Sequence, residues 1–307
     1  MLMNIGIIGA GAMGCLFASL LSSSHRVTLY DISRVTVDAV NLRGIRVEET
    51  DGDSEIFRIP AKLSGRDEEE KDLLILFVKA AATRSALAAN RALFGEGTVL
   101  LSLQNGLGNE EVIETFFPRE KVFLGTTKHN SVTTSPAEVF HSGAGVTVIG
   151  SPAGDEAGAK RIVDAFRSAG IETVFSPDVK RLLWEKLFVN MTINPITALL
   201  DKKIGFVAES AFAGELARVL ISEAVAVARA DGEEFSADEL TRSVLHTANL
   251  LSEGKASMCQ DIEKGRPTEI DYINGAVVRL GEKYNIPTLT HDAIVRLIHA
   301  KEAVARG

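Results

Sequence analysis

Cysteine is scarce in this sequence, and an apolar run of membrane-spanning length is missing. Only two of the 307 residues are cysteines, Cys15 and Cys259, so a disulfide framework is excluded. Neither lies in a CxxC or Cys/His cluster, and we therefore expect two buried thiols and no metal site. The first residues lead directly into an apolar strand pattern, without the basic segment and cleavage site of a secretion signal. These features predict a cytoplasmic protein that does not enter a membrane.

The charge balance excludes further classes of partner. The formal net charge is −8, which argues against a general binder of nucleic acid or of anionic membranes. A local basic pocket remains compatible with this value. The hydrophobic content of 46% is ordinary for a globular protein, and the length is sufficient for two domains with separate cores.

The first part of the chain has the pattern of an α/β domain. Short apolar runs alternate with connections long enough for helices, and such runs are typical of strands buried on both faces of a parallel, doubly wound sheet. The acidic segment Arg43–Asp72 interrupts this alternation, and Asp51-Gly52-Asp53 predicts a short hairpin within it. We assign residues 1–176 to this domain. The predicted strands are Ile5–Ile8, Val27–Tyr30, Leu73–Val78, Val99–Leu103, Val122–Leu124, Val146–Ile149 and Glu172–Phe175.

After Ser176-Pro177 the strand pattern ends, and helix signals follow one another. Ser236 and Glu239 have the spacing of a capping box, and Thr268 and Thr290 are positioned as the starts of the last two helices. We assign residues 177–307 to an all-α C-terminal domain.

The first predicted strand is followed by a glycine turn of the form GxGxxG. In this setting Gly9 permits the tight turn, Gly11 lets backbone N–H groups approach a pyrophosphate, and Gly14 allows close packing of helix on strand. The turn predicts a dinucleotide-binding domain of Rossmann type. A flavin is the alternative ligand, but no later motif supports it. The predicted cofactor-binding residues of the turn are Gly9, Ala10, Gly11, Ala12, Met13 and Gly14.

Two residues near the end of the second strand bear on the choice of cofactor. Asp31 is positioned to accept hydrogen bonds from the 2′-OH of the adenine ribose, and its charge repels a 2′-phosphate. It therefore favours NADH over NADPH. Arg34 argues the other way, because a guanidinium there could bind that phosphate, although a solvated side chain explains it equally well.

The stretch Leu182–Pro195 carries polar residues on a helix that is otherwise apolar. Lys186, Asn190 and Asn194 lie four residues apart, so they form one stripe, and the apolar residues around them predict burial. One interpretation is a set of satisfied core amides, with Lys186 reaching the surface. The other is a cleft wall whose lysine donates a proton to a reacting oxygen. Because Pro195 disfavours helical geometry at Asn194, we expect the helix to break or kink there.

The sequence resembles the ketopantoate reductases (2-dehydropantoate 2-reductases), which make pantoate for pantothenate and coenzyme A. The matching stretches span both predicted domains in the family's order, and those in the helical half are long and specific. They are GAGAMG at Gly9–Gly14, VKA at Val78–Ala80, QNGLG at Gln104–Gly108, GTTKH at Gly125–His129, WEKLFVNMTINPITA at Trp184–Ala198 and SMCQDIEKGRPTEIDYING at Ser257–Gly275.

The resemblance assigns roles to residues at the matching positions. It implies that NADPH is the cofactor, held in part by an arginine just after the second strand. Here Asp31 and Ile32 fill that place, with Arg34 nearby, which puts the usual NADPH preference in question. The implied catalytic residues are Lys186 and Glu269. The implied substrate-binding residues are Asn190, Asn194, Ser257 and Asn105, and Lys79 and Asn105 line the cofactor beyond the pyrophosphate.

Several of these residues also have a purely structural explanation. An acid at Glu269 suits the first turn of a helix capped by Thr268, without a catalytic role. Ser257 could serve only as a helix cap, and Asn105-Gly106 is a favourable turn in its own right. Lys79 and Asn105 both follow predicted strands, however, and ligands of open α/β sheets bind at the carboxyl ends of strands.

Reduction of a 2-keto acid requires a hydride at the carbonyl carbon and a proton at the oxygen. A nicotinamide supplies the hydride, and we expect Lys186 to supply the proton. Two alternatives are a related reductase of another small 2-keto acid and a non-catalytic dinucleotide-binding regulator. The presence of Lys186 and Glu269 argues against the regulator. The expected partner is therefore a small 2-keto acid. The sequence does not fix the oligomeric state, but the helical half could pair with a second copy in a homodimer.

Overall fold

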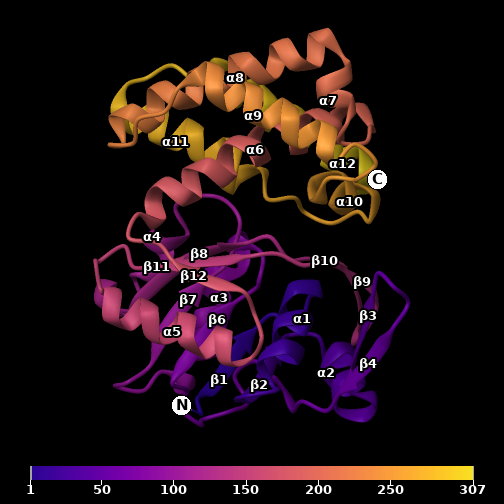
Figure 1. Ribbon diagram of the computed structural model, residues 1–307, viewed down its shortest axis with the longest axis vertical. Helices are drawn as coiled ribbons and strands as arrows, with labels where there is room; N and C mark the ends of the chain where they lie inside the picture. The colour runs from indigo at the N-terminus through magenta and orange to yellow at the C-terminus, as the bar shows by residue number, and fades with distance from the viewer. Residues whose placement is uncertain (1, 307) are drawn as a thin grey trace. The chain divides into compact units, whose positions relative to one another are not determined.

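The computed structural model describes residues 2–306 and divides the chain into two compact units. Unit 1 extends to Gln104 and continues with Asn109–Leu182, and unit 2 consists of Asn105–Gly108 and the residues from Leu183 onward. Helix α6 (Val179–Leu200) begins in unit 1 and continues into unit 2. A Rossmann-type sheet half followed by a helical half confirms the predicted fold class (Figure 1).

The main sheet of unit 1 has the strand order β12-β11-β8-β7-β6-β1-β2-β5 among the described residues. Six neighbouring pairs are parallel, but β11 pairs with β8 in antiparallel register. The prediction of a fully parallel sheet is therefore wrong at this pair. The segment between the two strands forms other strands instead of the helical crossover that parallel neighbours require. The strands are β1 (Asn4–Ile8), β2 (Arg26–Asp31), β5 (Ala61–Leu63), β6 (Leu73–Leu76), β7 (Val99–Ser102), β8 (Val122–Thr127), β11 (Thr147–Gly150) and β12 (Thr173–Phe175).

A smaller sheet of order β4-β3-β10-β9 completes the strands of unit 1 in the described chain. The predicted hairpin around Gly52 joins β3 (Ile45–Glu49) to β4 (Ser54–Phe57). The strands β9 (Asn130–Ser135) and β10 (Glu138–Gly143) were not predicted, because their residues are mostly polar and only partly buried. Parallel pairing of β10 with β3 joins segments that are distant in the sequence.

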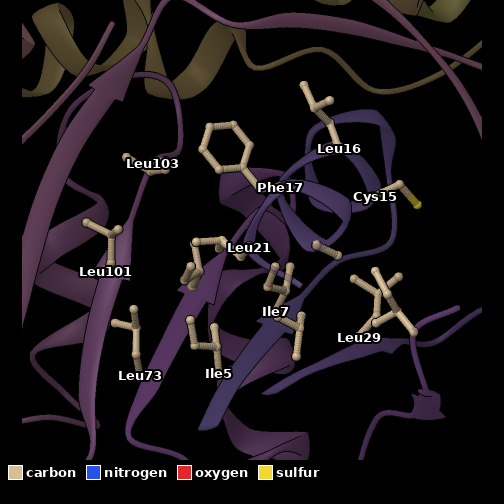
Figure 2. Packing of buried hydrophobic residues seen from close by; sticks show 14 of the residues in the cluster. Ile5, Ile7, Cys15, Leu16, Phe17, Leu21, Leu29, Leu73, Leu101 and Leu103 are labelled. Carbon is tan, nitrogen blue, oxygen red and sulfur yellow. The ribbon is translucent and has the colours of Figure 1, made fainter. Parts of the chain in front are cut away.

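Helix α1 packs on the central strands of the main sheet. Its buried side chains Phe17 and Leu21 belong to one apolar cluster with Ile5 of β1, Leu73 of β6 and Leu101 of β7, as Figure 2 shows. Ile7 and Cys15 belong to the same cluster, so one core holds the carboxyl half of β1 and the first turns of α1. The helices of unit 1 are α1 (Ala12–Leu21), α2 (Arg34–Arg43), α3 (Thr83–Ala89), α4 (Asn109–Ile113) and α5 (Glu156–Ser168), with short 3₁₀ turns η1 (Ala80–Ala82), η2 (Arg91–Leu93) and η3 (Arg119–Lys121).

Unit 2 is helical, as predicted. Trp184, Phe188 and Met191 of α6 are fully buried in its core, so α6 is apolar over most of its circumference. Of the expected break or kink at Pro195, the break is wrong: residues 191–198 are all buried, and the segment is helical to Leu200. The remaining helices are α7 (Phe206–Glu209), α8 (Ala211–Ala230), α9 (Ala237–Leu250), α10 (Ser257–Glu263), η4 (Ile270–Tyr272), α11 (Asn274–Tyr284) and α12 (Leu289–Arg306).

Of the predicted helix starts in unit 2, Ser236 and Thr290 are right and Thr268 is wrong. Ser236 accepts a hydrogen bond from the Glu239 N–H at 3.4 Å and caps α9. Thr290 is the second residue of α12, whereas Thr268 precedes η4 and α11 begins only at Asn274. Carboxylates from other helices bind the N–H groups of both threonines. Glu302 accepts from the Thr268 N–H at 2.7 Å, and Glu223 accepts from the Thr290 N–H at 3.0 Å.

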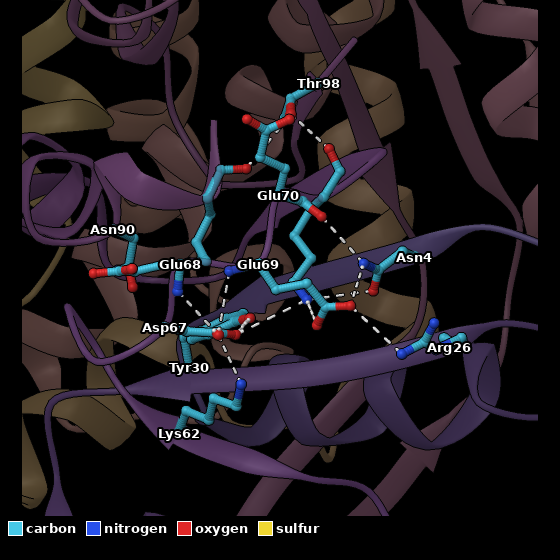
Figure 3. Close-up of polar contacts among 12 residues, drawn as sticks. Asn4, Arg26, Tyr30, Lys62, Asp67, Glu68, Glu69, Glu70, Asn90 and Thr98 are labelled. Atoms are coloured by element: carbon cyan, nitrogen blue, oxygen red, sulfur yellow. Dashed lines mark hydrogen bonds and ion pairs between the residues drawn. The ribbon is translucent and has the colours of Figure 1, made fainter. Parts of the chain in front are cut away.

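A buried lysine in unit 1 belongs to a polar cluster formed by residues of β1, of β2 and of the segment before β6. Lys71 donates to Glu69 at 2.7 Å and to the Asn4 side chain at 3.3 Å, and nearby Tyr30 donates to Asp67 at 2.5 Å (Figure 3). Internal partners satisfy this ammonium, so we assign it a structural role.

Within residues 2–306, no helix combines the length and apolar character needed to cross a bilayer. The same residues contain no group of three His, Cys, Asp or Glu side chains that could hold a metal ion. Both cysteines are buried and free, as expected.

Candidate active site

The glycine turn of unit 1 leaves no room for larger side chains at two positions. Gly9 has a φ of +108°, and a Cβ there would lie 2.8 Å from the backbone nitrogen of Val78. A Cβ on Gly14 would lie 1.8 Å from the Gly9 carbonyl oxygen. Both positions therefore require glycine, and the close approach of α1 to β1 depends on them.

Packing does not require glycine at position 11. A Cβ at this exposed position would meet no atom within 4 Å, so the space above the backbone is open. Gly11 is also the N-cap of α1, which has no side-chain cap and no acidic residue in its first turn. An uncapped helix N-terminus beside an open glycine fits an anionic pyrophosphate. The flanking residues Ala10, Ala12 and Met13 are buried or half-buried.

Asp31 ends β2 and contacts this turn directly. One carboxylate oxygen accepts the Ala10 N–H at 2.7 Å, and the other accepts the Ser33 N–H at 2.8 Å. The acid thus fixes the turn, and each oxygen retains a lone pair for a ribose hydroxyl. Arg34 is the exposed first residue of α2, and Ile32 is 85% exposed.

Lys79 follows β6 and is exposed at the start of η1. Gln104, which the sequence pattern did not single out, forms hydrogen bonds on both sides of Lys79 along the chain. The buried Gln104 side chain donates to the Val78 carbonyl at 2.8 Å and to the Thr83 hydroxyl at 2.9 Å. Gln104 lies in the QNGLG motif, and its position after an apolar strand was the available signal.

The polar stripe of α6 lies in unit 2. Lys186 and Asn190 are half-buried, and Asn194 is 7% exposed. Burial lowers the pKa of Lys186 to about 8, while the negative charge of Glu269 acts in the opposite direction. An amine with this pKa can both donate and accept a proton near neutral pH.

Glu269 is buried at the N-cap of η4, not within the first turn of an α-helix as expected. The Asn105 side chain donates to its carboxylate at 3.1 Å. Gly106 makes this contact possible, because its φ is +88° and a Cβ would lie 2.1 Å from the Tyr272 carbonyl oxygen. The Asn105–Gly108 turn is thus fastened against η4, and Asn105 belongs with the helical unit.

Unit 2 therefore brings the charges of Lys186 and Glu269 into interaction and joins Glu269 to Asn105. Ser257 is the exposed first residue of α10, where Ala256 is the N-cap. The glycine turn, Asp31, Arg34 and Lys79 form a separate group in unit 1.

Family models match most of the chain in two segments. A model described as "Ketopantoate reductase PanE/ApbA" matches residues 5–154, and one described as "Ketopantoate reductase PanE/ApbA C terminal" matches residues 178–302. The chain belongs to the ketopantoate reductase family. The resemblance noted in the sequence motifs is thereby confirmed.

Curated relatives of this ketopantoate reductase family member carry the name 2-dehydropantoate 2-reductase. The protein from Streptococcus pyogenes serotype M3 is 34% identical over 306 residues, covering 98% of this chain and 99% of the relative. The protein from Pyrococcus abyssi is 34% identical over 304 residues, with the same coverage.

Solved structures of two kinds of enzyme are similar to the chain. D-mandelate dehydrogenase, in a ternary structure with NADH and anilino(oxo)acetate, has a TM-score of 0.94 and 31% identity, with 99% of each chain covered. The 2-dehydropantoate 2-reductase from Geobacter metallireducens GS-15 has a TM-score of 0.89 and 30% identity, covering 96% of this chain and 99% of that one.

Proposed function

We propose that this protein is an oxidoreductase that reduces 2-dehydropantoate to pantoate with a nicotinamide dinucleotide. The reaction belongs to the biosynthesis of pantothenate and coenzyme A. The observation that carries the proposal is the constellation of Lys186, Glu269 and Asn105 in a family member. It combines an amine of lowered pKa with a buried, hydrogen-bonded carboxylate.

In this proposal the glycine turn binds the dinucleotide. The N–H groups at the start of α1 bind the pyrophosphate above Gly11, and Asp31 accepts hydrogen bonds from the adenine ribose. Lys79, at the carboxyl end of β6, lines the more distant part of the cofactor. When bound, the nicotinamide supplies the hydride that reduces the carbonyl carbon. The dinucleotide-binding domain comprises residues 1–176, and the helical domain comprises residues 177–307.

Lys186 donates the proton to the carbonyl oxygen, and its positive charge stabilises the oxyanion as it develops. Glu269 counteracts the effect of burial and keeps more of the amine protonated. Asn105 holds the Glu269 carboxylate in place by the hydrogen bond at 3.1 Å. Each of the three therefore has a task that the other two do not perform.

Three further polar residues bind the substrate. The Asn190 and Asn194 amides offer donors and acceptors to the carbonyl and to the distal hydroxyl of ketopantoate. Such amides discriminate against a substrate that lacks the hydroxyl, because they would be left unpaired. The Ser257 hydroxyl, exposed at the start of α10, binds the substrate carboxylate.

We further propose that NADH serves the enzyme at least as well as NADPH. The Asp31 carboxylate suits a free 2′-OH and repels a 2′-phosphate. Ile32 occupies the place at which the family pattern has an arginine. Arg34 opposes this preference, since it is exposed near the same end of β2.

A second candidate function is the reduction of another 2-keto acid. It is favoured by the similarity to D-mandelate dehydrogenase, whose structure holds NADH and anilino(oxo)acetate. To separate the two, purified protein is assayed with ketopantoate and with a phenyl-substituted 2-keto acid, each with NADH and with NADPH. Higher kcat/KM for ketopantoate supports the first function. Higher kcat/KM for the phenyl compound supports the second, and no oxidation of either cofactor with any keto acid contradicts both.

We also propose a homodimer formed through the helical domain. Leu289, Leu297 and Val304 of α12 are 76%, 53% and 81% exposed, and their spacing places them on one side of the helix. Exposed apolar side chains in such a row are typical of a protein interface. Light scattering tests this proposal, and a monomer at micromolar concentration contradicts it.

A further inference from the structure

Pro195 creates a local problem in α6. Proline has no N–H, so it cannot donate to the carbonyl of Met191 four residues earlier, as any other residue of the helix would. Met191 is fully buried. A buried carbonyl that loses its helical donor needs another one.

Asn274, the first residue of α11, donates to this carbonyl. Its Nδ2 lies 2.9 Å from the Met191 oxygen, and the side chain is fully buried. The orientation of the amide is fixed, because the flipped amide would place two oxygens against each other. A residue distant in the sequence thus supplies the hydrogen bond that Pro195 cannot make.

The second Nδ2 hydrogen of Asn274 is also used. It points to His291 Nδ1 at 3.1 Å, and the other ring nitrogen of His291 lies 2.9 Å from the Leu220 carbonyl oxygen. That carbonyl requires a proton on Nε2, so Nδ1 is the acceptor and the ring is neutral. Burial lowers the pKa of His291, although the Leu220 carbonyl and Glu223 oppose this, and the lowered pKa agrees with a neutral ring.

Donation to Met191 comes at a cost elsewhere in the same side chain. The Asn274 Oδ1 is buried and accepts no hydrogen bond from any residue in the range 2–306. An apolar side chain of similar size would avoid this unsatisfied oxygen. The hydrogen bond from Nδ2 to the Met191 carbonyl therefore explains why this residue is polar. Met191 lies between Asn190 and Asn194 on α6.

We propose that Asn274 is a positioning residue for the substrate-binding stripe of α6: by replacing the hydrogen bond missing at Pro195, it fixes the helical turn that carries Asn190 and Asn194. This inference rests on the proposed function, because it assigns those two asparagines to the substrate. The neutral His291 ring holds Asn274 in turn.

A double-mutant cycle tests the inference in the full-length protein. Pro195→Ala restores a backbone N–H that can donate to the Met191 carbonyl, so Asn274 becomes dispensable. We expect Asn274→Ala to raise KM for ketopantoate about tenfold in the native background, consistent with loss of one buried hydrogen bond. In the Pro195→Ala background the same change should raise KM less than about threefold. Loss of the His291 contact is common to both backgrounds and cancels.

Two controls accompany the cycle. The dissociation constant for NADH should stay unchanged in all variants, since the glycine turn belongs to unit 1. Asn249→Ala removes an exposed asparagine near the end of α9 and should change neither KM nor thermal stability. Thermal unfolding of the four proteins of the cycle gives a readout that does not depend on turnover.

The outcomes separate the possible failures. If Asn274→Ala acts equally in both backgrounds, in KM and in unfolding, the replacement hydrogen bond is wrong. If unfolding shows coupling while KM does not change, Asn274 has only a structural role and the proposal is overturned. If the native protein reduces no 2-keto acid, the proposed function fails, and the unfolding cycle still decides whether Asn274 substitutes for the missing donor.

Discussion

Replacing Lys186 by methionine should reduce activity and stabilise the fold at the same time. For activity, the amine must hold a proton at the start of each reduction. With its pKa lowered to about 8, native kcat/KM should be level below that pH and fall about tenfold per pH unit above it. Lys186→Met should lower kcat by roughly two to four orders of magnitude and lose this alkaline decline.

The sign of the effect on stability follows from how many protons the folded and unfolded states bind. Below about pH 8 the lysine is charged in the folded and unfolded states, and burial penalises the folded one. Between about pH 8 and 10.5 the unfolded chain binds more protons, so stability rises with pH. A pKa lowered from 10.5 to about 8 corresponds to roughly 3 kcal/mol. Methionine should raise the free energy of unfolding by up to this amount near neutral pH.

The assays are pH-dependent kinetics and urea unfolding, each on native protein and Lys186→Met. The gain in stability should shrink as the pH approaches about 10, because the native lysine then loses its charge. Loss of the attraction between Lys186 and Glu269 reduces the gain, and Glu269→Gln in the same background should restore it. In otherwise native protein, Glu269→Gln should shift the alkaline decline to lower pH, since it removes the charge that raises the pKa. An unchanged decline in Lys186→Met would refute the assignment of the proton donor.

Three other changes test the remaining parts of the site. Gly14→Ala should lower the melting temperature, because its methyl group would lie 1.8 Å from a carbonyl oxygen, whereas Gly11→Ala should leave it unchanged and weaken NADH binding about tenfold. Thermal melts and fluorescence titration with NADH measure both, and equal effects in the two variants contradict the description of the turn. Asp31→Asn should lower the ratio of kcat/KM for NADH to that for NADPH several-fold, and an unchanged ratio assigns the preference elsewhere. Gly106→Ala should displace the turn from η4 and lower kcat without changing the dissociation constant for NADH, and an unchanged kcat contradicts a role for that turn.

The features that the sequence predicted well depend on short segments. The glycine turn could be predicted because a strand, three glycines and a helix follow one another in the sequence. The inward stripe of α6 could be predicted because Lys186, Asn190 and Asn194 share a helical spacing with apolar residues around them. Both predictions needed no information about residues distant in the chain.

The features that the sequence could not predict depend on pairing across the chain. The strands β9 and β10 are half-exposed and polar, so their pattern does not differ from that of a loop, and they are stabilised by pairing of β10 with β3. Glu269 was expected within the first turn of an α-helix, but it lies at the N-cap of η4, where Glu302 of α12 accepts from the Thr268 N–H. Local capping patterns contain no information about such partners.

Lys71 and Lys186 show what the structure adds to the information in the sequence. Lys71 is 2% exposed and Lys186 is half-buried, so both side chains lose contact with water. Lys71 donates to a carboxylate at 2.7 Å and to an amide oxygen at 3.3 Å, so its charge is satisfied within unit 1. Lys186 has its pKa lowered by burial, and the charge of Glu269 only partly offsets this. Folding therefore gives Lys186 a pKa at which it can release its proton near neutral pH, as reduction of a keto acid requires.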